Sequence, residues 1–206
     1  IYKIGVSELI QSAFLIVTTL LLNNFSIQHG EGVVASFGIA LRIVQIPEFF
    51  TMGIVLGVMP LIAYNFSNKN LSRLKESIKY STLFIFVISV LFVGIVYIFR
   101  NQVMHAFSSD TSVLQIGSYI LVAMLISTIF NGLTALFMTI YQASGEGIAT
   151  GIMAISQGCL YIPVVITLHY FYGLHGLIWS MTITEITTCL IGIVLFIIYN
   201  KKLKKI

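Results

Sequence analysis

Apolar residues gather in six long stretches that are separated by short polar segments. The third stretch is the clearest, because no charged residue occurs between Tyr80 and Phe99. About 20 consecutive apolar residues suffice to cross a bilayer. In hydrocarbon the backbone must satisfy its own hydrogen bonds, which leaves helices or closed barrels, and these runs are too continuous for alternating barrel strands. The pattern predicts six transmembrane helices, over residues 5–25, 33–64, 78–99, 113–141, 148–171 and 176–199.

Composition supports a membrane location for the whole chain. Hydrophobic residues make up 58% of the 206 residues, and charged residues make up only 9%. A soluble domain carries about 25% charged residues to keep its surface hydrated. Cys159 and Cys189 both lie in apolar helices and are interpreted as small hydrophobic residues. The fold class that follows is an all-α integral membrane bundle over residues 1–206.

The first segment of the chain does not look like a signal peptide. A predicted helix begins close to Ile1, and no charged segment and small-residue cleavage site of the kind found in a signal peptide precede it. The chain also does not begin with Met. We therefore expect a fragment or a processed chain.

Basic residues fall almost entirely on one side of the six predicted crossings. Arg100 alone marks the opposite side, and Arg42 lies within the membrane. The residues on the basic side are Lys3, Lys69, Arg73, Lys75, Lys79, Lys201, Lys202, Lys204 and Lys205. The positive-inside rule places this side, and with it both termini, in the cytoplasm of a multi-pass protein of the cell membrane. A net charge of +4 suits anionic membrane lipid as a partner, so nucleic acid need not be invoked.

The second predicted helix is unusually long. Its 32 residues, at about 1.5 Å each, exceed a hydrocarbon core of about 30 Å. Pro47 and Pro60 each remove a backbone donor, while Gly53 and Gly57 leave room for a neighbouring backbone. The helix should therefore kink or tilt, and its glycines serve either close packing or a moving hinge.

Glu185 is the strongest candidate for a functional residue. It is the tenth residue of the predicted helix 176–199, close to the middle of the membrane. A charge at this depth costs about 2.5 to 3.5 kcal/mol on insertion scales, so such residues are functional candidates by default. Met181 and Thr188 lie on the same face of the helix. Glu185 is predicted to hold a cation or a proton, and the alternative is a structural hydrogen bond between helices.

A second carboxylate, Glu48, follows Pro47 near the middle of the long helix, where a kink would leave carbonyl groups free. Arg42 lies six residues earlier, on a different face, so it does not pair with Glu48 along the helix. Glu48 is therefore a second candidate for ion or substrate binding.

Four further polar residues are candidates for the same site. Glu8 and Gln11 lie one turn apart at the cytoplasmic end of the first helix, where Glu8 could also be solvated. Asn131 and Gln157 are amides in the middle of their helices, and such amides also serve to hold helices together.

Motifs of enzymes and metal sites are missing. The sequence has no Gly-x-Ser-x-Gly nucleophile turn and no phosphate-binding loop. No two of its four histidines have the i, i+4 spacing of a helical zinc site. We expect a protein that is not an enzyme and has no resident metal or cofactor.

Three short motifs resemble those of one transporter family. Residues 57–73, GVMPLIAYNFSNKNLSR, resemble a Gly-x-x-Pro followed by Tyr-Asn and a basic cytoplasmic loop in the multidrug and toxic compound extrusion (MATE) family. Residues 141–145, YQASG, are similar to its aromatic-Gln-Ala-x-Gly turn. Pro163 and residues 173–179, GLHGLIW, match landmarks of the last two helices of one lobe.

This resemblance implies a twelve-helix transporter built from two six-helix lobes, of which this chain is similar to the C-terminal one. Family members export organic cations and amphipathic drugs in exchange for Na⁺ or H⁺. The implied partners are the N-terminal lobe and small organic cations. Sodium-coupled members carry a carboxylate in the first helix of this lobe, where this chain has Gln11, with Glu8 one turn away.

Two rival functions remain open at this point. A lipid-linked oligosaccharide flippase of the same superfamily would need a cavity rich in arginine, and this chain offers only Arg42 inside the membrane. A structural membrane protein without a substrate would use Glu48 and Glu185 only to pair helices. For an exporter, Phe130 and Tyr161, with Met138 and Met181, could form an adaptable apolar wall.

Overall fold

A computed structural model describes residues 2–203, and every regular element in that range is an α-helix. Lys204 and Lys205 of the basic tail lie outside the described residues. The helices are α1 (Tyr2–Ile27), α2 (Glu31–Ser67), α3 (Leu71–Ile98), α4 (Arg100–Phe107), α5 (Thr111–Ala143) and α6 (Gly147–Leu203).

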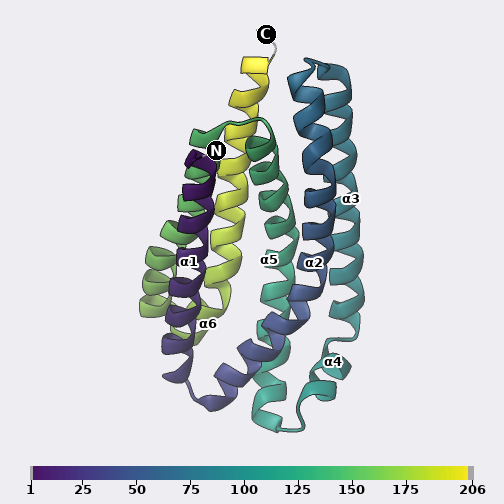
Figure 1. The fold of residues 1–206 in the computed structure, drawn as a ribbon. Helices are drawn as coiled ribbons and strands as arrows, with labels where there is room; N and C mark the ends of the chain where they lie inside the picture. Colours follow the sequence, from purple (N-terminus) through teal and green to yellow (C-terminus); the bar gives the residue numbers. More distant parts are fainter. Residues whose placement is uncertain (1, 204–206) are drawn as a thin grey trace.

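Helix α6 doubles back on itself at Gly173, so it consists of a first arm, residues 147–172, and a second arm, residues 174–203 (Figure 1). Gly173 adopts φ 56° and ψ −130°, a conformation that side chains disfavour. The two arms approach so closely that a Cβ atom on Gly176 would lie 1.9 Å from the carbonyl oxygen of Leu168. Glycine is therefore required at both positions for the hairpin.

Five helices are long and apolar enough to cross a membrane, and the last of them covers both arms of α6. The chain therefore crosses the membrane six times and is an all-α bundle, one six-helix lobe. Large apolar side chains such as Phe84, Leu91 and Ile95 are exposed on its outside. That surface suits lipid rather than water.

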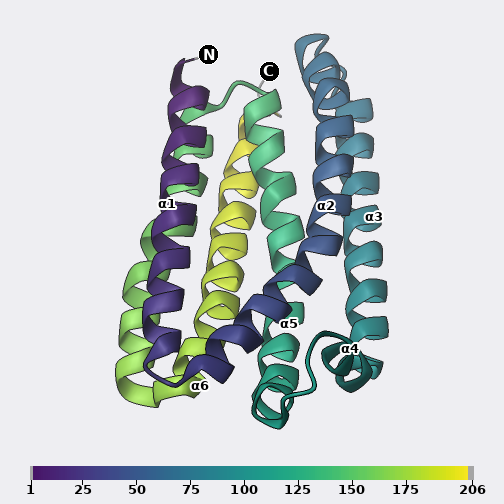
Figure 2. The same cartoon turned by 60° about the horizontal axis from the view of Figure 1, so that its bottom comes forward.

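Helix α5 lies in the middle of the bundle, packed against α2, α3 and α6, while α1 packs along α6 (Figures 1 and 2). The core has two parts along the length of the bundle. One contains Phe37 and Leu121, and the other contains Ile62 and Leu136. The central position of α5 explains why buried side chains occur along its whole length.

Helix α2 is bent, as the sequence predicted for a long helix with internal prolines (Figures 1 and 2). Sharp bends in helices almost always occur at proline, and Pro47 lies inside α2. A Cβ atom at Gly53 or Gly57 would meet nothing within 4 Å. Within the described residues, these two glycines therefore do not serve close packing.

Polar residues extend helix α3 well beyond its predicted apolar stretch and form the additional helix α4. Helix α3 begins at Leu71, where the side chain of Asn70 accepts a hydrogen bond from the backbone N–H of Arg73 at 3.2 Å. The short helix α4 was not predicted, because eight residues of mixed polarity give no membrane signal. Asp110 caps α5, and its bonds from Ser112 lower the pKa of the Asp110 carboxyl group.

Candidate functional site

Glu185 lies on the second arm of α6 and accepts two hydrogen bonds from neighbouring helices. The amide of Gln157, on the first arm, donates to Glu185 Oε1 at 3.0 Å. The amide of Asn131, on α5, donates to the same oxygen at 3.3 Å. The structure therefore brings together three of the polar residues that the sequence singled out.

A fourth candidate extends this chain of hydrogen bonds to α1. Gln11 Nε2 donates to Gln157 Oε1 at 2.9 Å. Because Gln157 uses its oxygen towards Gln11 and its nitrogen towards Glu185, it connects the two. We call Gln11, Gln157, Glu185 and Asn131 the polar network, and it links α1, α5 and both arms of α6.

The second carboxyl oxygen of Glu185 has a different environment. Oε2 is buried and has no hydrogen-bond partner among the described residues. A buried polar atom without a partner is costly, and the cost is larger when the group is charged. The polar network therefore holds Glu185 by one oxygen, while the other has no partner among the described residues.

Glu48, on α2, faces the same region of the bundle. Its carboxyl group and that of Glu185 are close enough to repel each other when both are charged. Glu48 itself is half-buried and makes no hydrogen bond to the described residues. Two carboxyl groups that repel each other favour a bound cation or proton, because either one removes part of the repulsion.

Glu8 is separate from the polar network. It is exposed on α1, and Gln142 Nε2, at the end of α5, donates a hydrogen bond to its carboxyl group. Gln142 belongs to the YQASG motif but was not predicted as a site residue. The only sequence signal for this contact was that both polar side chains lie on the predicted cytoplasmic side, Glu8 near the start of α1 and Gln142 at the end of α5.

The family is decided by comparison with known proteins. The MatE family model matches residues 4–168 of the chain. The chain belongs to the MatE family. The resemblance seen in the sequence motifs is thereby confirmed.

Curated relatives of this MatE chain are multidrug export proteins. The MepA protein of Staphylococcus haemolyticus is 39% identical over 97% of the chain, and the aligned part covers 44% of that relative. The MepA protein of Staphylococcus aureus strain NCTC 8325 is 38% identical over 90% of the chain and 41% of that relative. The MatE chain therefore spans less than half the length of the curated relatives it matches.

Solved structures share the fold of the chain. One is a multidrug resistance MATE family transporter in an outward-facing conformation, with a TM-score of 0.90, 18% identity and coverage of 99% of this chain and 47% of that one. Another is the Vibrio cholerae MATE transporter VcmN in a bent form, with a TM-score of 0.86, 18% identity and coverage of 98% and 46%. These proteins are transporters and not enzymes, in agreement with the sequence.

Two of the side chains expected to form an apolar wall are buried in this MatE chain. Tyr161 and Met138 are buried within the bundle, with exposed fractions of 4% and 6%. Phe130 and Met181 are half-buried. Tyr161 and Met138 therefore belong to the packed interior, and only Phe130 and Met181 remain partly accessible to a ligand.

Two histidines meet at the end of the bundle away from the termini. The rings of His29, which follows α1, and His169, on α6, lie 5.2 Å apart, and Phe25 packs on His169. Burial and the neighbouring His169 lower the pKa of His29. Among residues 2–203, no group of three or more side chains suited to a metal ion occurs.

Proposed function

We propose that this chain is the C-terminal six-helix lobe of a twelve-helix antiporter that exports cationic or amphipathic drugs in exchange for H⁺ or Na⁺. The half-length match to multidrug export proteins supports a second lobe of similar size. The resemblance of the first helix to the one that opens the second lobe supports the C-terminal position. The antiporter would lie in the cell membrane with both termini in the cytoplasm, as the distribution of basic residues predicts.

The environment of Glu185 is the observation that carries this proposal. Its Oε1 is fixed by the amides of Asn131 and Gln157, whereas its buried Oε2 has no partner among the described residues. A glutamate that only joined helices would have both oxygens satisfied, since buried polar groups are normally paired. The free oxygen gives a cation or a proton a place to bind.

Exchange follows from the two carboxyl groups. The charges of Glu48 and Glu185 would oppose each other, so a proton or a cation bound at either carboxyl group would reduce the repulsion. A drug cation and a coupling ion would therefore compete for one site, as antiport requires. Alternating access would come from rocking of the two lobes around this site.

The named relatives favour drug export over lipid-linked oligosaccharide transport. MepA proteins are multidrug export proteins by name. A flippase would need several arginines for a diphosphate, and this chain offers only Arg42 within the membrane, exposed on α2. An organic cation suits a site built from carboxyl and amide oxygens.

Transport by the complete protein in liposomes tests the proposal. We expect export of ethidium when an inward H⁺ or Na⁺ gradient is imposed, and no export without a gradient. Residues 1–206 alone should transport nothing, because one lobe cannot form a two-lobe pathway. Gradient-independent export, or export by residues 1–206 alone, would contradict the proposal.

A further inference from the structure

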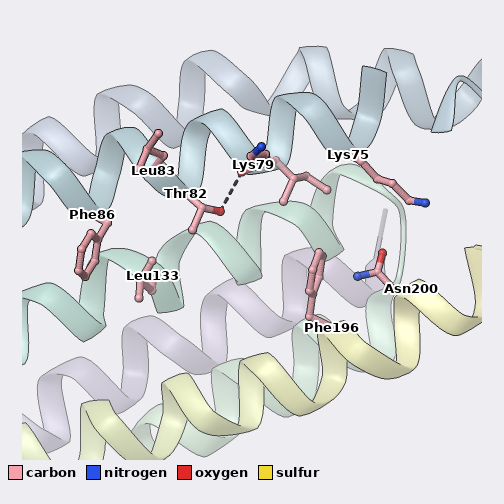
Figure 3. A pocket seen from close by; sticks show the side chains of 9 residues that line it. Lys75, Lys79, Thr82, Leu83, Phe86, Leu133, Phe196 and Asn200 are labelled. Carbon is pink, nitrogen blue, oxygen red and sulfur yellow. Dashed lines mark hydrogen bonds between the residues drawn. The ribbon is translucent and has the colours of Figure 1, made fainter. Parts of the chain in front are cut away.

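A groove of about 720 Å³ lies between α3, α5 and the second arm of α6, away from the polar network (Figure 3). Lys75 and Lys79 of α3 line one side of it, and Phe196 and Asn200 of α6 line the other. The groove lies towards the end of the bundle where the chain terminates, because Asn200 is close to the end of α6.

The mouth of the groove is cationic. Lys75 and Lys79 are one turn apart, so both ammonium groups come from the same face of α3. Both side chains are exposed, and neither forms an ion pair or hydrogen bond with the described side chains. The side chain of Asn200 adds an amide that can donate to an anion. Three donors therefore surround the mouth, and no carboxylate of the described residues lines the groove.

The interior of the groove is apolar. Leu83 and Phe86 continue the same side of α3, and they are 54% and 46% exposed. Leu133 of α5 and Phe196 of α6 face them. Phe86 lies seven residues beyond Lys79, which is about 10 Å along a helix. A bound molecule would thus need an anionic head and an apolar part at least this long.

We propose that this groove binds one anionic phospholipid, with its phosphate between Lys75 and Lys79 and an acyl chain along Phe86 and Phe196. The cations proposed to bind at the polar network would not bind in this groove, because the ammonium groups of Lys75 and Lys79 would repel them. A soluble anion would leave Leu83 and Phe86 without a contact. Leu83 and Phe86 are exposed on the apolar surface of α3, so a phospholipid from the bilayer could reach the groove there. This inference concerns lipid only and does not depend on what the protein exports.

Native mass spectrometry of the complete protein in detergent tests the site with added phosphatidylglycerol. We expect one phosphatidylglycerol to bind more tightly than phosphatidylcholine. The Lys75→Gln/Lys79→Gln variant should bind it on the order of 30-fold more weakly, since each lysine near an anionic headgroup contributes to attraction. Lys75→Arg/Lys79→Arg keeps both charges and should retain binding.

The control removes two charges from the same end of the protein but outside the groove. Lys69→Gln/Arg73→Gln should bind phosphatidylglycerol as the unchanged protein does, because neither residue lines the groove. Circular dichroism and a single gel-filtration peak establish that each variant is folded.

Three results would overturn the proposal. Equal loss in the two charge-removing double variants would mean that net charge alone attracts the lipid. Equal binding of phosphatidylcholine would mean that the headgroup is not recognised. Displacement of phosphatidylglycerol by millimolar inorganic phosphate would mean that the groove is a phosphate site and the apolar part is not used.

Discussion

Gln157 occupies the centre of the polar network, because its side chain makes two hydrogen bonds at once. It donates to Glu185 and accepts from Gln11. Loss of its amide would therefore take the acceptor away from Gln11 and leave Glu185 Oε1 with only the longer bond from Asn131. A single hydrogen bond between membrane helices contributes about 0.6 kcal/mol, and about 1.7 kcal/mol at most.

We expect Gln157→Leu to lower the free energy of unfolding by about 1 to 2 kcal/mol, since two such bonds are lost together. Asn131→Leu should cost less, because its contact with Glu185 is longer, at 3.3 Å. Gln115→Leu makes the same change at an exposed position of α5 and should be nearly neutral. Unfolding in denaturant, followed by circular dichroism, measures all three. Equal effects of the Gln157 and Gln115 changes would contradict a network centred on Gln157.

At the scale of single residues, the sequence identified candidates but not their partners. Glu185, Gln11, Asn131 and Gln157 stand out because polar groups are rare in apolar helices. Their meeting at one point depends on how each helix is rotated about its axis. Packing in three dimensions sets that rotation, and one helix in isolation does not reveal it. Gln142 was not predicted as a site residue for the same reason, since its partner Glu8 lies on another helix.

The hairpin inside α6 depends on close approach of its two arms. Because a Cβ atom on Gly176 would lie 1.9 Å from Leu168 O, a side chain there must push the arms apart. We expect Gly176→Ala to destabilise the protein by about 1 to 3 kcal/mol, the usual range for overpacking. Gly94→Ala, on α3, would meet nothing within 4 Å and should be neutral or slightly stabilising. The melting temperatures of the two variants test this, and equal values would contradict the tight hairpin.

At the scale of elements, hydropathy predicted the helices that cross the membrane but not the helical segments outside it. Six apolar stretches correspond to six crossings, and the break between the last two corresponds to the turn at Gly173. The bend of α2 was also predicted, because proline removes a backbone donor. The polar start of α3 and the whole of α4 lie outside the apolar stretches, so hydropathy carried no information about them.

In the whole molecule, the start of α1 and the end of α6 lie on the side of the α2–α3 turn (Figure 1). Topology tags inserted at Asn68 and after residue 205 should both report the cytoplasm. A tag at Ser109, between α4 and α5, should report the outside. Signals from opposite sides for Asn68 and the C-terminus would contradict a lobe with six crossings.

The central claim at this scale is that the polar network positions Glu185 to bind the exported cation or the ion exchanged for it. Glutamine at position 185 keeps an oxygen that Asn131 and Gln157 can donate to, but it removes the negative charge. A purely structural glutamate would therefore tolerate this change and keep much of the activity, whereas a binding glutamate would not.

The most direct measurement is efflux of a cationic drug by the complete transporter carrying Glu185→Gln, beside Glu48→Gln, at matched protein levels. We expect Glu185→Gln to abolish export while expression and folding stay near normal. Loss of export only in Glu48→Gln would indicate that the binding carboxylate is Glu48 on α2. Unchanged export by the Glu185→Gln transporter would contradict the assigned role of Glu185.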